Sequence, residues 1–135
     1  MYSITLGLLL LFSLVIWVEP GADSTKIQAQ KLVNSMLDSF KTKNKTIIAQ
    51  NIDKNVMINF CNVAKFQYDM VVILLDLGMT IDPIKLNVTS AKFENSKTLQ
   101  GHGETKLLLR NMTLDFYLKK IENRWKLHLL DFKTC

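Results

Sequence analysis

Three side chains in this sequence could support acid–base chemistry: Asp131, His102 and His128. Asp131 follows three large apolar residues on one face of the last expected strand, and a carboxylate in such a place could be the general base of an isomerase or dehydratase. Strict alternation puts His128 on the opposite face, so a dyad with Asp131 requires a bulge. His102 stands between two glycines and has no predictable partner. A solvated Asp131 and a surface His102 are the simpler alternatives.

Other kinds of chemistry find no support in the motifs. The chain has no Gly-x-Ser-x-Gly elbow, phosphate-binding loop, metalloprotease helix or calcium loop. Its two cysteines, Cys61 and Cys135, occur neither in a Cys-x-x-Cys pair nor beside a histidine, which argues against redox catalysis and zinc binding. We therefore expect no metal and no cofactor.

The amino-terminal segment has the pattern of a secretory leader. Residues 4–18 are largely apolar and are followed by Glu19-Pro20-Gly21 and by the small residues Ala22 and Ser24. The run is shorter than the roughly 20 residues that span a membrane, and no basic stop-transfer cluster follows it. We predict a signal peptide over residues 1–22, cleaved at 21 to 24, with an uncleaved anchor as the alternative. The product would be secreted, without a stable membrane anchor.

Two further features agree with an extracellular location. Asn44, Asn87 and Asn111 each begin a glycosylation sequon. The number of cysteines is even, as expected where disulfides form. One bridge between Cys61 and Cys135 would close a loop of about 75 residues and stabilise the fold by roughly 4 kcal/mol. Two buried free thiols are the alternative. Nucleic acid is not an expected partner outside the cell, and the net charge of +5 is read as a solvated basic surface.

Hydrophobic periodicity divides residues 23–135, expected to be one domain, into helices followed by strands. Period 3.6 predicts helices over residues 24–41, 46–52 and 62–77, with a short strand over residues 55–60. After Asp82-Pro83 the period changes to 2, which predicts strands over residues 84–89, 98–109, 114–118 and 124–134. Segregated helices and strands indicate an α+β domain with helices packed on one face of a curved antiparallel sheet.

This order, with Leu114-Asp115-Phe116-Tyr117-Leu118 and Arg124-Trp125-Lys126-Leu127-His128-Leu129 as the final pair, resembles the nuclear transport factor 2-like fold. More narrowly, it is similar to small secreted nematode proteins of this fold, which also have a Trp early in the last strand and a terminal Cys. The resemblance implies that the first strand lies beside the last, which makes a Cys61–Cys135 bridge geometrically reasonable. It also implies that Asn87 lies on an edge strand.

The sequence departs from that family at the residues on which the known activities of its members depend. It matches neither the partner-binding residues of the transport factor nor the acid–base residues of the isomerases and dehydratases that share the fold. The concave face would be lined by large side chains, either around a ligand pocket or as a filled core: Leu86, Leu114, Phe116, Leu118, Trp125, Leu127 and Leu129.

We therefore expect a secreted, non-enzymatic domain that binds a small apolar ligand or a protein partner. One alternative is a cofactor-free isomerase or dehydratase with Asp131 as base. Another is a cystatin-like protease inhibitor, although Gln100-Gly101-His102-Gly103 does not match the Gln-x-Val-x-Gly hairpin expected there. The resemblance also allows a homodimer through the convex sheet face, where Tyr117 and Phe132 are the exposed aromatic candidates.

Overall fold

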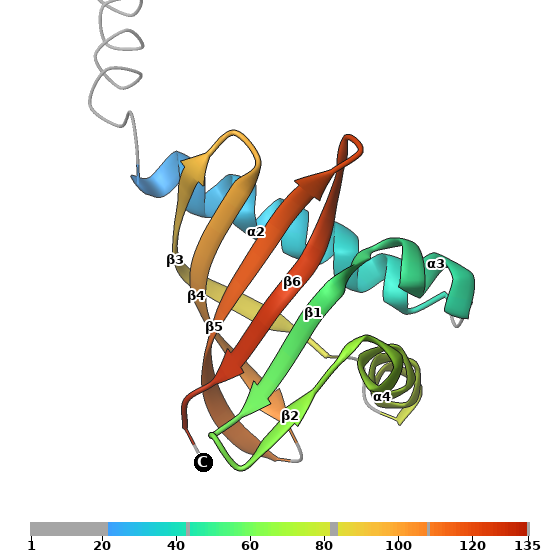
Figure 1. Ribbon diagram of the computed structural model, residues 1–135. Helices are drawn as coiled ribbons and strands as arrows, with labels where there is room; N and C mark the ends of the chain where they lie inside the picture. Colours follow the sequence, from blue (N-terminus) through green and yellow to red (C-terminus); the bar gives the residue numbers. More distant parts are fainter. Residues whose placement is uncertain (1–21, 43, 82–83, 108, 135) are drawn as a thin grey trace, which may run out of the picture.

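The computed structural model describes residues 22–42, 44–81, 84–107 and 109–134. Cys135 and all of the predicted signal peptide except its last residue lie outside the described residues. Within them the elements follow the order α2 (Ala22–Phe40), α3 (Lys45–Gln50), β1 (Ile52–Phe60), β2 (Ala64–Phe66), α4 (Tyr68–Ile81), β3 (Leu86–Asn95), β4 (Thr98–Leu107), β5 (Arg110–Ile121) and β6 (Arg124–Phe132) (Figure 1). None of the described helices is long and apolar enough to cross a membrane.

The strands form one curved sheet in the order β2-β1-β6-β5-β4-β3, with α2 lying across its concave face (Figure 1). The expected α+β architecture is confirmed, but the sheet is mixed, because β1 and β6 run parallel while the other neighbouring pairs are antiparallel. A parallel pair needs a long connection between its strands, and more than sixty residues separate these two. The first strand therefore lies beside the last.

The helix predicted over residues 62–77 begins later than expected. Cys61 and Asn62 both have positive φ, 53° and 59°, and the Val63 N–H donates to the Phe60 carbonyl at 2.9 Å. These are the features of a type I′ turn, which folds the chain back as the short edge strand β2 before α4 begins. Asn62 is therefore a turn residue and lies outside the helix.

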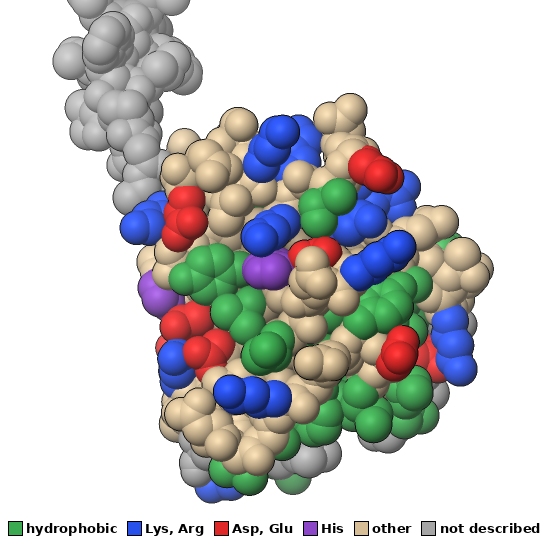
Figure 2. All heavy atoms as spheres, in the orientation of Figure 1, with side chains coloured by type: hydrophobic (Ala, Val, Ile, Leu, Met, Phe, Trp, Pro, Cys, Tyr) green, Lys and Arg blue, Asp and Glu red, His purple; other side chains and the backbone are tan. Residues whose placement is uncertain are grey.

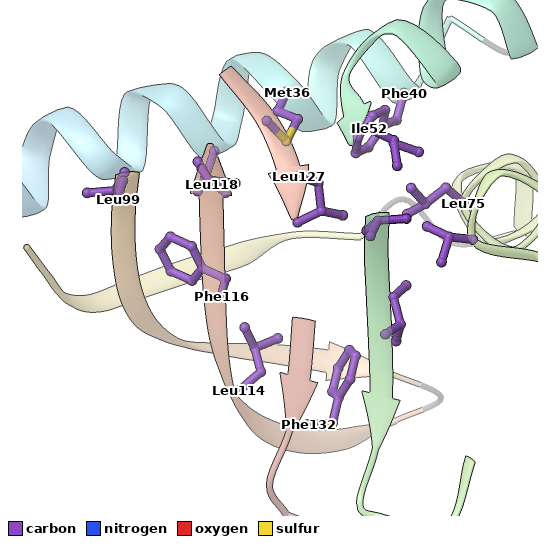
Figure 3. Packing of buried hydrophobic residues seen from close by; sticks show 14 of the residues in the cluster. Met36, Phe40, Ile52, Leu75, Leu99, Leu114, Phe116, Leu118, Leu127 and Phe132 are labelled. Carbon is purple, nitrogen blue, oxygen red and sulfur yellow. The ribbon is translucent and has the colours of Figure 1, made fainter. Parts of the chain in front are cut away.

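The hydrophobic core lies between α2 and the concave face of the sheet (Figure 3). The helical stripe of α2 buries Ala29, Val33, Met36 and Phe40, at the spacing that the sequence predicts. Alternate residues of the central strands face this stripe, led by Leu114, Phe116 and Leu118 of β5. Each such side chain contributes about 1.5–3 kcal/mol on burial, so the helix and the sheet stabilise each other.

A β-bulge in β6 changes which of its residues face the core. Tyr117 pairs with Leu129 but Leu118 pairs with Leu127, so His128 is an extra residue in β6. Before the bulge Leu127 points inward, and after it Leu130 and Phe132 do so, opposite Phe116 and Leu114. Strict alternation therefore gives the wrong face for the residues that follow His128.

The side-chain amide of Gln30 from α2 bonds to the beginning of the edge strand β3. Gln30 Nε2 donates to the Leu86 carbonyl at 2.8 Å, and its Oε1 accepts from the Val88 N–H at 2.7 Å. The amide thus satisfies two backbone groups that an edge strand otherwise leaves unpaired. Asn87 lies between them on this edge and is exposed, as the resemblance implies.

The sheet bends where Phe116 packs over Gly101. The two residues are cross-strand partners on β5 and β4, and a Cβ at Gly101 would come within 2.8 Å of three ring carbons of Phe116. Only glycine leaves room for the ring at this position.

We expect Gly101→Ala to destabilise the fold by about 1–3 kcal/mol, because the new methyl group overpacks the buried Phe116 ring. Urea unfolding followed by circular dichroism measures the change. Lys92→Ala, at an exposed position of the neighbouring strand, should leave stability nearly unchanged. In a double-mutant cycle, Phe116→Leu should reduce the cost of Gly101→Ala, and equal costs in the two backgrounds would contradict this explanation.

Asp53 of β1 and His128 of β6 form a part-buried contact, with Asp53 Oδ2 and His128 Nδ1 2.7 Å apart. Burial tends to raise the pKa of the Asp53 carboxyl. Hydrogen bonds from His128 and the Asn55 N–H, with the nearby charges of His128 and Lys119, outweigh burial and hold that pKa below its ordinary 3.8.

Since folding lowers the pKa of Asp53, the ionised carboxylate stabilises the fold above pH 3.8, and this contribution is lost as the pH falls through the folded value. The free energy of unfolding should therefore fall less between pH 5 and pH 3 in Asp53→Asn than in the parent protein. Glu94→Gln, at an exposed position, should keep the parent slope. An unchanged slope in Asp53→Asn would show that this carboxylate does not contribute to the acid sensitivity.

Candidate functional site

The concave side of the sheet encloses an apolar cavity of about 70 Å³ between α2, α4 and the central strands. Its polar lining residue is Thr105, whose hydroxyl donates to the Lys85 carbonyl at 2.6 Å and is thereby satisfied. The other lining residues are apolar: Val33, Met36, Leu37, Phe40, Leu75, Ile84, Leu86, Leu114, Phe116, Leu118, Leu127, Leu130 and Phe132. A molecule in this cavity would contact walls of hydrocarbon.

A shallow groove of about 290 Å³ adjoins the cavity where α2 approaches the start of β3. The groove and the cavity share the side chains of Leu37, Ile84 and Leu86. Beyond these shared residues the groove is polar, with Asn34, Asp38, Lys41 and Lys85 along its sides. Lys41 Nζ lies 3.4 Å from Asp38 Oδ1, so one of the two lysines is partly neutralised. The apolar cavity thus meets a charged groove.

The structure brings most of the sequence-predicted lining together. Five of the seven residues line the cavity: Leu86, Leu114, Phe116, Leu118 and Leu127. Trp125 faces the same side but lies outside the lining, with its ring 6.0 Å from that of Phe93. Leu129 was expected to face the cavity and does not, because the bulge at His128 turns it outward beside Tyr117.

Sequence reasoning missed the lining residues that α2 and the end of β6 supply. Val33, Met36, Leu37 and Phe40 of α2 have the spacing of an apolar helical stripe, which predicts only that they face the core. Their signal was therefore present, but periodicity does not tell a filled core from a cavity wall. Strict alternation puts Leu130 and Phe132 on the outer face, whereas both face the core, and Phe132 is buried rather than available for a dimer contact.

Asp131 lies on the outer face of the sheet, which contradicts the alternative in which it is the general base of an isomerase or dehydratase acting in the cavity. Its Oδ1 accepts a hydrogen bond from Asn59 Nδ2 at 2.9 Å, and its Oδ2 lies 2.6 Å from Lys133 Nζ. The hydrogen bond and charge of Asp131 raise the pKa of Lys133. The carboxylate links β6 to β1 through its hydrogen bond with Asn59. It lies on the other side of the sheet from the cavity and cannot reach a molecule there.

Both histidines pair with aspartates on the outer face. His102 Nδ1 contacts Asp115 Oδ1 across β4 and β5, a partner that the sequence did not reveal, while His128 contacts Asp53. The bulge needed for a His128–Asp131 dyad is present, yet His128 takes a different partner. Figure 2 shows acidic, basic and histidine side chains mixed over this face. Both His–Asp contacts join neighbouring strands of the sheet.

The three sequon asparagines are exposed. Asn44 caps α3, because its Oδ1 accepts from the Thr46 N–H at 3.0 Å, and this leaves its Nδ2 available for modification. Asn87 and Asn111 both line a polar cleft of about 540 Å³ across the ends of β3, β4 and β5. Glycosylation at each position stays a prediction that the structure accommodates.

Cys61 follows β1 and is half-buried, and its N–H donates to the Phe132 carbonyl at 3.1 Å. The end of β1 therefore lies beside the end of β6, three residues before Cys135. Since Cys135 is outside the described residues, its bridge to Cys61 remains a prediction.

The segment Gln100–Gly103 lies within β4, paired with β3 on one side and with β5 on the other. A protease inhibitor of the cystatin kind would need it in an exposed hairpin loop, so this placement argues against that alternative.

Comparison with known proteins supports the fold alone. No family model matches the chain, and no curated protein matches it. Among solved structures, it is similar to an NTF-2 like protein of unknown function from Shewanella oneidensis MR-1, with 12% identity and a TM-score of 0.61, covering 82% of this chain and 98% of that one. An NTF2-like protein of unknown function from Pseudomonas putida KT2440 has 7% identity and a TM-score of 0.58, covering 85% and 90%.

A third similar structure is a domain of unknown function with a cystatin-like fold from Nostoc punctiforme PCC 73102, with 10% identity and a TM-score of 0.58 over 81% of this chain and 76% of that one. At such identities similarity extends to architecture and not to activity. On the helices, the curved sheet and these matches, the chain has the nuclear transport factor 2-like fold.

Proposed function

We propose that this domain binds a small amphiphile, with the apolar tail in the cavity under α2 and an anionic head in the adjoining groove. The observation that carries the proposal is the meeting of an apolar cavity with a groove that carries Lys41 and Lys85. Binding sites for small molecules commonly combine apolar walls with a few polar groups that fix orientation. Leu37, Ile84 and Leu86 form the boundary that such a ligand would cross.

The size of the cavity restricts the tail. A volume of about 70 Å³ is roughly half of the 150 Å³ or so that admits benzene in an engineered cavity. A rigid ring is therefore too large, whereas the end of an unbranched alkyl chain fits. Met36 lines the cavity, and its flexible thioether side chain allows the wall to adapt to a longer tail.

The charges of the groove select the head. Lys85 and Lys41 are exposed, and Asp38 partly neutralises Lys41, so the groove keeps a net positive charge. A carboxylate, sulfate or phosphate head is favoured over an ammonium head by the sign of this charge. Acid–base catalysis by Asp131 is not part of the proposal, because that carboxylate lies on the other face of the sheet.

The proposed setting is extracellular. The apolar leader, the exposed sequon asparagines and the position of Cys61 beside the end of β6 support a secreted glycoprotein with a Cys61–Cys135 bridge. Native mass spectrometry of the protein expressed in a eukaryotic host, before and after glycan removal, tests this setting and the ligand together. A deglycosylated mass two hydrogens below that of the reduced chain indicates the bridge, and additional retained mass reports a bound molecule.

Titration with octanoate and octylammonium, which share a tail and differ in head charge, tests the site itself by isothermal calorimetry. Octanoate should bind more tightly. Leu37→Trp should weaken octanoate binding at least tenfold by blocking the boundary between groove and cavity. Lys85→Glu should weaken it about two- to fivefold, the effect of one exposed charge pair.

Lys92→Glu is the matched control, since Lys92 is an exposed lysine on β3 away from the groove and its variant should bind octanoate like the parent protein. Equal binding of both probes, or octanoate binding that Leu37→Trp leaves unchanged, would place the ligand elsewhere and overturn the proposal.

A further inference from the structure

Helix α4 presents apolar side chains on both of its faces. Val71 and Leu75 are buried against β1, α3 and α2, as expected for a helix that joins a core. The opposite face exposes Met70, Ile73, Leu74 and Leu77, which are 47%, 46%, 37% and 55% accessible. Their spacing of i, i+3, i+4 and i+7 makes one continuous stripe, called here the α4 stripe. Hydrophobic side chains gather over β2 and α4 in Figure 2.

The α4 stripe is large enough for a weak interface. Roughly half of four large side chains is exposed, on the order of 300–400 Å² of apolar surface, which is the size of patch that often marks an interaction site. Two such stripes in contact would bury about twice that area. Since about 57% of a typical interface is non-polar, the whole contact would reach roughly 1,200 Å², the lower limit for a specific complex.

The surroundings of the α4 stripe suit a second, antiparallel α4. Antiparallel pairing about a two-fold axis near Ile73 and Leu74 brings Leu77 of one copy beside Met70 of the other. Met70 borders a cleft of about 440 Å³ whose walls include Met57 and Tyr68. Leu77, the most exposed side chain of the stripe, thus faces a recess, and the two-fold symmetry makes this contact occur twice.

The charges at the ends of α4 agree with this orientation. The last turn of α4 has no basic residue to balance the negative end of the helix dipole. Lys54 lines the cleft beside Met70, together with Asp69 of the first turn. In the antiparallel pair, Lys54 of each copy would lie next to the carboxyl end of the other copy's α4 and supply the missing positive charge.

We propose that the α4 stripe is a self-association surface, through which two copies of this chain form a symmetric antiparallel dimer. The interface lies on the opposite side of α4 from the core, and it does not include the groove or the polar outer face of the sheet. The inference is independent of the proposed ligand.

Sedimentation velocity on the purified full-length secreted product, up to about 500 µM, tests the proposal at the weak affinity that an interface of this size implies. The parent protein should show a concentration-dependent monomer–dimer equilibrium. Leu74→Asp and Leu74→Lys should each raise the dimer dissociation constant at least tenfold. The charge introduced at the two-fold axis lies beside the same charge of the other copy, and the two repel each other. Circular dichroism melting shows whether each variant is folded.

Mixing the Leu74→Asp and Leu74→Lys variants provides the decisive result. The introduced carboxylate of one copy and the introduced ammonium of the other attract each other across the interface, so the mixture should restore association as a heterodimer.

Ile27→Asp is the matched control: Ile27 is an exposed isoleucine on α2, and its variant should associate like the parent protein. A parent protein that stays monomeric, including one that instead binds vesicles of neutral lipid, overturns the proposal. So does a dimer that both Leu74 variants leave intact, which would place the interface elsewhere.

Discussion

The β-bulge at His128 determines what each face of this domain can do. One extra residue in β6 keeps Leu127 in the core and then turns Leu130 and Phe132 inward, while Leu129 and Asp131 face outward. Without the bulge, Asp131 would point at the apolar cavity and Phe132 would lose its contact with Phe60, whose ring centre lies 4.8 Å away. The separation of an apolar inner face from a polar outer face thus depends on one local irregularity.

The polar contacts of the outer face follow from the same irregularity. His128 is free of the regular ladder, and its ring reaches Asp53 on the parallel neighbour β1. Asp131, turned outward, bonds to Asn59 of the same strand β1. The β1–β6 pair joins segments that are distant in sequence, and these side-chain contacts add to its backbone hydrogen bonds. Asp131 and His128, which resemble catalytic residues in the sequence, therefore form side-chain contacts that hold β6 against β1.

The sequence predicts the elements of this fold better than their details, for reasons that particular residues make clear. Periods of 3.6 and 2 located α2 and β5, where long stripes such as Leu114-x-Phe116-x-Leu118 leave little ambiguity. The turn at Cys61-Asn62 was missed because neither residue is glycine, although asparagine tolerates positive φ. The bulge was missed because Leu127, Leu129 and Leu130 are equally apolar, so composition cannot show which of them faces the core.

The same ambiguity limits the candidate site. Five lining residues were predicted because each has a polar neighbour on the strand that identifies its face, whereas the lining from α2 could not be told from core. Whether packing leaves a cavity depends on side-chain volumes summed across elements distant in sequence, and no local pattern records that sum.

Helix α4 connects the two surfaces on which the proposals rest. Leu75 lines the cavity, and its neighbour Leu74 belongs to the α4 stripe on the outside of the same helix turn. Because the helix backbone is rigid over one turn, a displacement that repacks Leu74 against another molecule also moves Leu75 and changes the volume available to a ligand. Any such coupling must act in both directions, since a ligand that holds Leu75 in one position also fixes the stripe. Because the cavity is small, it is sensitive to such a displacement. The volume that one side chain fills or vacates when it moves is a substantial fraction of about 70 Å³.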